Sequence, residues 1–566
     1  MPTRSTLTPA GAVLLVILAA LAGCANPGRP GAGRAGSSAP AAGESSAARM
    51  DYSSDAIAAR TESLAQYALG VLHDEGDEPR EAADAYARAA LADLGNTDLV
   101  LEASFRLLKL KRTDAAIDLL TKATAVPSPS ALLLARLGLA HSIAGDRPKA
   151  IEANRRAIQR DPSLIAGYQF LAQLLLQENQ AQEGLKVLAE AARQPKPDAL
   201  FLVELGESYL RFARAGQAEA ARPRALEAFR RAAALKPSSP PLVQRLADGF
   251  VDSGDAAQGA RLYGQLLALA PEWPGLRQRL VEVLIRTGDH TNAIAHLRDI
   301  LAESPTDVQS LYVLGSILFE ERQLKEARDQ FEKVLRLRPD FEPGYQDLAA
   351  TLIGLNEPED ALETLRLARK RFPKRFVWEY YSALAHTRMK DYANALRFLT
   401  AAEIIARVSE TNRLTPTLYF QLGSACERTQ RFQEAEQHFR RALAIDPNFA
   451  EALNYLGYMW AERGENLAEA RQMIEKAVRL EPRNPAFLDS LGWVLFKQNQ
   501  PAAALPYLLQ AIELNEEPDA TLYDHLGDIY AALQKTEQAR EAWRKAYELD
   551  PTEPVQRKLR DAPRSR

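Results

Sequence analysis

The chain has 566 residues, several times the usual length of one globular domain, so it must fold as several domains or as an array of repeats. Hydrophobic residues make up 46% and charged residues 25% of the sequence, which is ordinary for a folded protein. The 70 Lys and Arg residues are slightly outnumbered by 74 Asp and Glu residues, so the chain lacks the basic excess of a protein that binds nucleic-acid backbones.

An apolar run, residues 11–22, is the first predicted element, and only one basic residue, Arg4, precedes it. A helix that spans a bilayer needs roughly 20 apolar residues, whereas the core of an export signal needs only about 7 to 15. The run therefore indicates an export signal. The residues at its end, Leu21 to Cys24, read LAGC and resemble the lipobox of bacterial lipoprotein precursors at every position.

The lipoprotein resemblance implies that residues 1–23 form a signal peptide and that Cys24 carries lipid as the first residue of the mature chain. An ordinary cleaved signal with a coincidental cysteine is the alternative. The number of cysteines favours lipidation. The chain has only one other cysteine, Cys426. If Cys24 carries lipid, Cys426 has no disulfide partner within the chain, which fits a buried thiol. Ala25 is not the aspartate that retains many such lipoproteins in the inner membrane. We therefore expect a lipid anchor in the outer membrane, on its periplasmic face, with surface exposure also open.

Residues 24–50 are predicted to form a lipidated, flexible tether. The sequence from Ala25 to Arg49 is rich in Ala, Gly, Ser and Pro and shows no apolar period, so it cannot build a core. A flexible chain of roughly 25 residues has a mean reach of about 25 to 30 Å. The tether therefore keeps the folded body close to the lipid surface.

The body of the chain, residues 51–553, repeats one pattern. A Leu-Gly or Leu-Ala pair is followed by a small residue, a packed residue and a proline, as in Leu314-Gly315, Ala327, Phe331 and Pro339. These are the signature positions of the tetratricopeptide repeat of about 34 residues, which the chain resembles from about residue 63 onward. Fourteen units fit this register, and they begin at Ser63, Thr97, Ala131, Ile165, Ala199, Pro240, Pro274, Val308, Glu342, Phe376, Pro416, Ala450, Pro485 and Ala520.

Each half of a unit has apolar residues at spacings of three and four, which predicts two helices per repeat. Each helical pair leaves an apolar face uncovered, so neighbouring pairs must stack. We therefore expect an all-α fold, an α-solenoid that forms a right-handed superhelix of about 14 tetratricopeptide repeats with a concave groove. Some repeats hold surplus residues, that is, residues in excess of the 34 of a standard unit. Those near 216–222 and 407–412 are expected in turns. Residues 554–566 are expected to form a partial cap and a disordered tail.

No pattern of catalytic or metal-binding residues is present, so we expect a protein that is not an enzyme and that needs no cofactor or metal. The seven histidines are dispersed, and the sequence has no HExxH, Walker or G-x-S-x-G motif. His73, His141, His386 and Cys426 occupy a repeat position that usually holds a packed aromatic side chain. Each of the four is therefore expected to be structural, and Cys426 is expected to be an inert thiol.

Positions 5 and 9 of the first helix generally face the concave surface in this family. In units five to fourteen these positions are acidic at both ends, as at Glu207 and Asp248, and aromatic toward the middle and the carboxyl side. Tyr458 and Trp493 lie at equivalent positions of adjacent repeats, beside acidic residues. Such mixtures are typical of protein interfaces, although packing against neighbouring helices is the alternative. The clamp with which chaperone-binding arrays hold acidic tails is missing, so a basic or apolar partner is expected. The predicted partner-binding groove consists of Asn454, Tyr458, Asp489, Trp493, Asp524 and Asp528.

The segment 454–547, with its DSLGW and HLGD elements, is similar to the last repeats of large proteobacterial outer-membrane tetratricopeptide lipoproteins. One such lipoprotein is an adaptor for a periplasmic carboxyl-terminal processing protease. The resemblance implies a lipid-anchored scaffold or adaptor that captures envelope proteins or peptides and presents them to a periplasmic protease. A structural part of an exopolysaccharide, secretion or pilus-assembly apparatus is one alternative, and a glycan or peptidoglycan binder is another. Neither nucleic acid nor a small-molecule substrate is expected as a partner.

Overall fold

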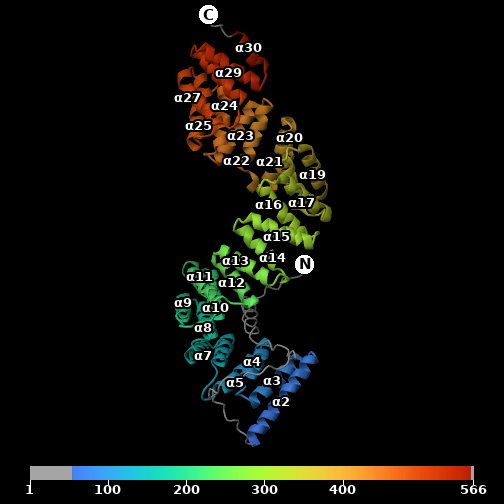
Figure 1. Ribbon diagram of the computed structural model, residues 1–566, viewed down its shortest axis with the longest axis vertical. Helices are drawn as coiled ribbons and strands as arrows, with labels where there is room; N and C mark the ends of the chain where they lie inside the picture. Colours follow the sequence, from blue (N-terminus) through green and yellow to red (C-terminus); the bar gives the residue numbers. More distant parts are fainter. Residues whose placement is uncertain (1–53, 562–566) are drawn as a thin grey trace, which may run out of the picture. The chain divides into compact units, whose positions relative to one another are not determined.

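The computed structural model describes residues 54–561, and every regular element in that part of the chain is a helix (Figure 1). Successive helices pack in pairs, and neighbouring pairs stack on one another. This arrangement confirms the predicted all-α solenoid of tetratricopeptide repeats. The chain divides into two compact units, and the division falls between Ala293 and Ile294.

The described part of unit 1 contains six helical pairs followed by one further helix. The pairs are α2 (Ser54–Glu75) with α3 (Pro79–Ala92), α4 (Thr97–Lys109) with α5 (Thr113–Thr124), α6 (Ala131–Ile143) with α7 (Arg147–Arg160), α8 (Ile165–Gln177) with α9 (Ala181–Ala192), α10 (Ala199–Phe212) with α11 (Ala218–Ala234), and α12 (Pro240–Ser253) with α13 (Ala256–Leu269). A short π-helical turn, η1 (Ala213–Gln217), joins α10 to α11, and α14 (Leu276–Arg286) follows the last pair.

Unit 2 contains seven helical pairs. The pairs are α16 (Val308–Glu320) with α17 (Leu324–Leu337), α18 (Glu342–Gly354) with α19 (Pro358–Arg371), α20 (Phe376–Arg388) with α21 (Tyr392–Ser409), α22 (Pro416–Arg428) with α23 (Phe432–Ile445), α24 (Ala450–Arg463) with α25 (Leu467–Leu480), α26 (Pro485–Lys497) with α27 (Pro501–Leu514), and α28 (Ala520–Ala532) with α29 (Thr536–Leu549). The division between the units falls inside α15 (His290–Glu303), and the 3-10 turn η2 (Thr411–Arg413) precedes α22. A last helix, α30 (Glu553–Asp561), packs on α29.

The first helix of nearly every repeat begins at the residue that the sequence register gives. Two starts differ. Helix α2 begins at Ser54 instead of Ser63, and α14 begins at Leu276 instead of Pro274. The second difference has a local cause, because Gly275 has a φ of 74° and therefore precedes the helix as a left-handed residue.

The surplus residues do not stay in turns as predicted. In the fifth repeat they form η1 and lengthen α11 to 17 residues, and in the tenth they lengthen α21 to 18 residues. The extension of α21 contains two good helix formers, Ala406 and Arg407, and the guanidinium of Arg407 pairs with the carboxylate of Glu403 at 2.6 Å, one turn earlier. Helix extension is therefore locally more favourable here than a longer loop.

Small residues at the signature positions let large side chains approach the first helices. A Cβ atom added to Gly315 would lie 2.7 Å from the ring of Phe331, and one added to Gly423 would lie 2.6 Å from the ring of Phe439. Both rings are fully buried. The glycines therefore provide the space into which the aromatic rings pack.

Two glycines on α13 give a prediction about this packing. A Cβ atom at Gly259 would lie 2.5 Å from Cγ2 of Val251 and 3.0 Å from the carbonyl oxygen of Ala247, whereas one at Gly264 meets nothing within 4 Å. Gly264→Ala should raise the free energy of unfolding by about 0.5–1 kcal/mol, because it removes backbone freedom from the unfolded chain. Gly259→Ala should lower it by about 1 kcal/mol or more, because a β-branched side chain on a helix moves aside poorly. Urea unfolding followed by circular dichroism measures both, and equal shifts for the two variants would contradict the packing.

Among the residues that the structure describes, no helix combines the length and the apolar character needed to cross a membrane. The predicted export signal, Cys24 and the predicted tether lie outside the described residues. They therefore remain predictions from the sequence.

Candidate functional site

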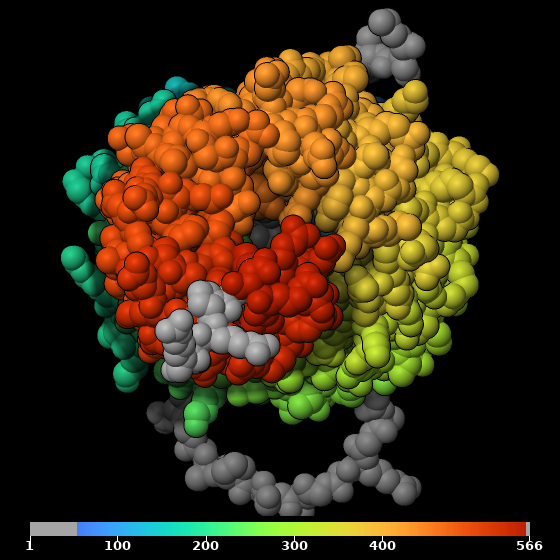
Figure 2. All heavy atoms as spheres, turned by 90° about the horizontal axis from the view of Figure 1, so that it is seen from above, coloured from blue at the N-terminus to red at the C-terminus, as the bar shows by residue number. Residues whose placement is uncertain are grey.

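The first helices of the last three repeats, α24, α26 and α28, pack side by side and form a continuous seam. Helix α24 contacts the next first helix, α26, and α26 in turn contacts α28. In a curved stack, the helices on the inner side lie closest together. Figure 2 shows the repeats of unit 2, coloured yellow to red, around a hollow. The side chains of the predicted groove therefore lie on neighbouring first helices.

The structure brings the six predicted groove residues together in pairs along this seam. Asn454 and Tyr458 lie on α24, Asp489 and Trp493 lie on α26, and Asp524 and Asp528 lie on α28. Three of them are more buried than residues that contact a partner are expected to be. Asn454 is 8% exposed, and Asp489 and Trp493 are each 7% exposed. The other three are partly buried.

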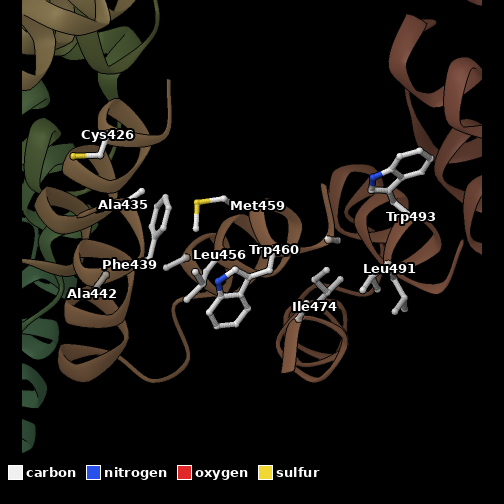
Figure 3. Packing of buried hydrophobic residues seen from close by; sticks show 14 of the residues in the cluster. Cys426, Ala435, Phe439, Ala442, Leu456, Met459, Trp460, Ile474, Leu491 and Trp493 are labelled. Atoms are coloured by element: carbon white, nitrogen blue, oxygen red, sulfur yellow. The ribbon is translucent and has the colours of Figure 1, made fainter. Parts of the chain in front are cut away.

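Trp493 is the centre of an aromatic stack that crosses from α26 to α28. Its ring centroid lies 3.9 Å from that of His525, with the two planes 15° apart, and 5.0 Å from that of Phe496. The indole Nε1–H donates a hydrogen bond to the carboxylate of Glu462 on α24. Figure 3 shows the indole on the opposite side of α26 from Leu491, although both side chains belong to one buried cluster. Trp493 therefore links three consecutive first helices.

Asp489 and His525 form a buried hydrogen-bonded pair across the same seam. The Nδ1 atom of His525 lies 2.8 Å from Oδ1 of Asp489, at hydrogen-bond distance. Burial alone would lower the pKa of His525, but this hydrogen bond and the nearby carboxylates outweigh burial and raise it. The carboxylate of Asp489 therefore favours the charged imidazolium. Sequence reasoning did not select His525, because it lies at position 6 of its helix.

Lysine 558 neutralises the acidic residues of the last repeat. Its ammonium group lies 2.8 Å from the carboxylate of Asp524 and 2.7 Å from that of Asp528, and Asp528 also accepts a hydrogen bond of 3.0 Å from Nε1 of Trp543. Burial raises the pKa of Asp528. Lys558 is supplied by α30, so these two carboxylates, predicted as partner contacts, are already paired within the chain.

The acidic positions of the middle repeats are paired as well. The guanidinium of Arg245 donates two hydrogen bonds of 2.8 Å to the carboxylate of Glu207. Asp248 accepts from the hydroxyl of Tyr263 at 2.5 Å and from Nη2 of Arg279 at 3.1 Å. The negative charge predicted at Glu207 and Asp248 is therefore largely compensated by arginines of neighbouring helices.

Two carboxylates that sequence reasoning did not select complete the seam around Tyr458. Glu427 lies in the last turn of α22, and its side chain is 28% exposed. Glu462 lies on α24 and is exposed. Burial, and then the charges of Glu462, Asp489 and Glu427, raise the pKa of the Tyr458 hydroxyl. We call Glu427, Tyr458, Glu462, Asp489, Trp493 and His525 the acidic–aromatic cluster.

Three of the four residues predicted to be structural pack against neighbouring side chains, and His73 is the exception. Cys426 is 1% exposed, His141 is buried, and His386 stacks on Phe398 with 5.3 Å between ring centroids. His73 is only partly buried and pairs with Glu78 at 2.6 Å. The part of the chain that the structure describes contains no group of three or more His, Cys, Asp or Glu side chains placed to hold a metal ion.

Burial raises the pKa of the Cys426 thiol to about 11, so the reactive thiolate is scarce at neutral pH. In a full-length Cys24→Ser variant, where Cys426 is the only thiol, we expect almost no reaction with a disulfide reagent at pH 7.5. Complete reaction should follow in 8 M urea. Absorbance of the released thiolate measures both, and rapid reaction of the folded protein would show that Cys426 is accessible.

Comparison with known proteins agrees with this architecture. Sequence profiles described as tetratricopeptide repeat match residues 106–165, 250–317, 318–386, 376–448, 420–485 and 490–554, which is more than half of the chain. No curated protein is significantly similar to the chain.

Several solved structures are similar in fold. A tetratricopeptide repeat protein from Parabacteroides merdae is 18% identical, with 45% of this chain and 97% of that chain covered and a TM-score of 0.37. The APC/C hetero-tetramer Cut9-Hcn1 is 17% identical, with 84% and 94% covered and a TM-score of 0.37. YrrB, described as a TPR protein with an unusual peptide-binding site, is 20% identical, with 37% and 97% covered and a TM-score of 0.29. The repeat profiles and the stacked helical pairs show that the chain belongs to the tetratricopeptide-repeat proteins, whose repeats serve as protein–protein interaction scaffolds.

Proposed function

We propose that this protein is a lipid-anchored scaffold of the bacterial cell envelope that captures envelope proteins with the first helices of its repeats. The observation that carries the proposal is the sequence LAGC at Leu21 to Cys24, placed directly after an apolar run of export-signal length. Only residues 25–53 separate Cys24 from α2, the first helix that the structure describes, so the repeats would work within reach of the lipid surface.

The repeat array supports a binding role for the body of the chain. Repeats stack into an extended surface on which a partner can make many contacts. The resemblance of residues 454–547 to the last repeats of an outer-membrane adaptor favours one role in particular, the delivery of captured proteins to a periplasmic protease. In this proposal, one part of the array holds the protease and another part holds its substrate.

Acylation is tested by metabolic labelling with an alkyne-bearing palmitate analogue in a Gram-negative host. The wild-type chain and a Cys426→Ser control should be labelled and should sediment with the outer membrane, whereas Cys24→Ser should be unlabelled. Both cysteine variants change one thiol, so the comparison isolates the lipobox. Label that persists in Cys24→Ser, or a wild-type chain without label, would contradict the lipid anchor.

The adaptor role is tested by affinity purification of the tagged, acylated chain from its native membranes after chemical cross-linking. We expect mass spectrometry to identify a protease together with proteins whose abundance rises when the gene is deleted. A preparation that contains neither, or deletion that leaves every co-purified protein at its normal abundance, would contradict delivery to a protease.

A further inference from the structure

The acidic–aromatic cluster holds three carboxylates, and among the described residues only that of Asp489 has a hydrogen-bonded partner that can carry a positive charge; the ammonium group of nearby Lys497 donates to the backbone carbonyl of Glu462 and not to its carboxylate. Asp489 is paired with His525, but Glu462 takes part in no ion pair among the described residues, and its carboxylate accepts only the indole N–H of Trp493. The nearest cation to Glu427 is Nε of its neighbour Arg428, at 3.6 Å, which is too long for a hydrogen bond. The carboxylates of Glu427 and Glu462, whose charges both act on Tyr458, are therefore available to an external cation.

A buried acceptor on the same helix also lacks a donor. Asn454 lies one helical turn before Tyr458 and is 8% exposed, and its Oδ1 atom has no hydrogen-bond partner within the described residues. Buried polar atoms are nearly always hydrogen-bonded, so an unpaired one needs an explanation. A bound cation with several N–H donors would supply the missing donor and a counter-charge to the two carboxylates together.

The aromatic rings of the cluster suit a cation as well. The ammonium group of Lys497 lies 5.0 Å from the ring centroid of Trp493, so the indole already takes part in a cation–π contact within the chain. Tyr458 offers a second ring beside Glu462, with its centroid 6.4 Å from that of His525. Rings of this kind can also pack against the long aliphatic part of a lysine or arginine side chain.

We propose that the acidic–aromatic cluster binds lysine or arginine side chains of a basic segment in the captured protein. Glu427 and Glu462 pair with the charged group, Tyr458 packs against its stem, and Asn454 accepts one of its N–H groups. This inference rests on the proposed scaffold function and adds the chemical class of the partner. A metal ion is a poor alternative, because these side chains do not form a group that could coordinate one.

Fluorescence anisotropy with the purified, detergent-solubilised chain tests the proposal. The probes are three labelled ten-residue peptides in one Gly/Ser host, with four lysines, four glutamates or four glutamines at the same positions. We expect the lysine peptide to bind, more weakly as salt is added, and the other two not to bind. Glu427→Gln with Glu462→Gln should weaken binding by about tenfold or more.

The matched control is Glu537→Gln with Glu541→Gln, which removes two exposed carboxylates from α29, a second helix. This control changes the net charge equally but should leave affinity for the lysine peptide within about twofold, because binding at the cluster is local. Equal weakening in both double variants, or no binding of the lysine peptide, would overturn the proposal. Glutamine keeps the size and the acceptor of Glu462, and thermal unfolding of each variant checks that the repeats stay folded.

The peptide-binding experiment and the experiments on the scaffold function can fail separately. If the acylated chain co-purifies with partners that the Glu427/Glu462 double variant also retains, the scaffold function stands and the basic-segment inference fails. If the lysine peptide binds at the cluster but Cys24 carries no lipid, the inference about the cluster stands and the envelope anchor fails.

Discussion

Replacing Trp493 by alanine is expected to lower the free energy of unfolding of the last repeats by about 3–5 kcal/mol, the usual cost of truncating a buried tryptophan. The side chain is 7% exposed, stacks on His525 and Phe496, and donates to Glu462. Repeat proteins can unfold in parts, so the measurement should be local. Native-state hydrogen exchange of α24, α26 and α28 is suited to it.

Trp493→Phe is the control for this prediction. Phenylalanine keeps a ring against His525 but removes the hydrogen bond to Glu462, so the loss should be about 1–2 kcal/mol. If Trp493→Ala instead kept full protection in the three helices but lost partner binding, Trp493 would act as a contact residue, as the sequence pattern suggested. The structure predicts instead that Trp493→Ala lowers the stability of these helices, because the side chain is buried between them.

Replacing His525 by leucine is expected to cost about 3–5 kcal/mol as well, because it leaves the carboxylate of Asp489 buried without its partner. Asp489 is only 7% exposed, and Nδ1 of His525 lies 2.8 Å away. The double variant Asp489→Leu with His525→Leu should recover most of this loss, since it removes both charges. Local hydrogen exchange compares the variants, and a double variant less stable than His525→Leu alone would contradict the pairing.

The same pair makes the stability of unit 2 depend on pH in a defined direction. The pKa of His525 is raised in the folded protein, so its contribution is complete below the ordinary histidine pKa of about 6.5 and is lost as pH rises through the higher folded value. The wild-type repeats should therefore lose stability as the pH rises from about 6.5 through the higher folded pKa of His525. Urea midpoints measured across this range should fall more steeply for the wild type than for the double variant.

The fold could be predicted from the sequence because its determinants are local. Small residues such as Gly315 and Ala327 recur at fixed offsets, and prolines such as Pro339 follow the second helices. These positions fix where helices begin and which side chains meet within a repeat. They did not reveal that surplus residues extend α21, because a turn and an added helical turn satisfy the same register.

The candidate site could be predicted only in part, because its contacts join different repeats. The sequence selected Trp493 and Asp489 but not His525, which lies 36 residues from Asp489. It also treated Asp524 as free, whereas Lys558 of α30 lies 34 residues away and pairs with it. Whether such a position is open or buried depends on how closely the first helices of neighbouring repeats approach, and periodicity alone does not give that distance.

Site-specific photo-crosslinking in living cells tests the central claim, that envelope proteins are held by the first helices of unit 2. A photoreactive amino acid would replace Glu462 on α24 or, as the matched control, Gln472 on α25, the second helix of the same repeat. Both positions are exposed. We predict a cross-linked partner from position 462 that is absent from position 472. Cross-links of equal yield from both positions, or from position 472 alone, would contradict capture by the first helices.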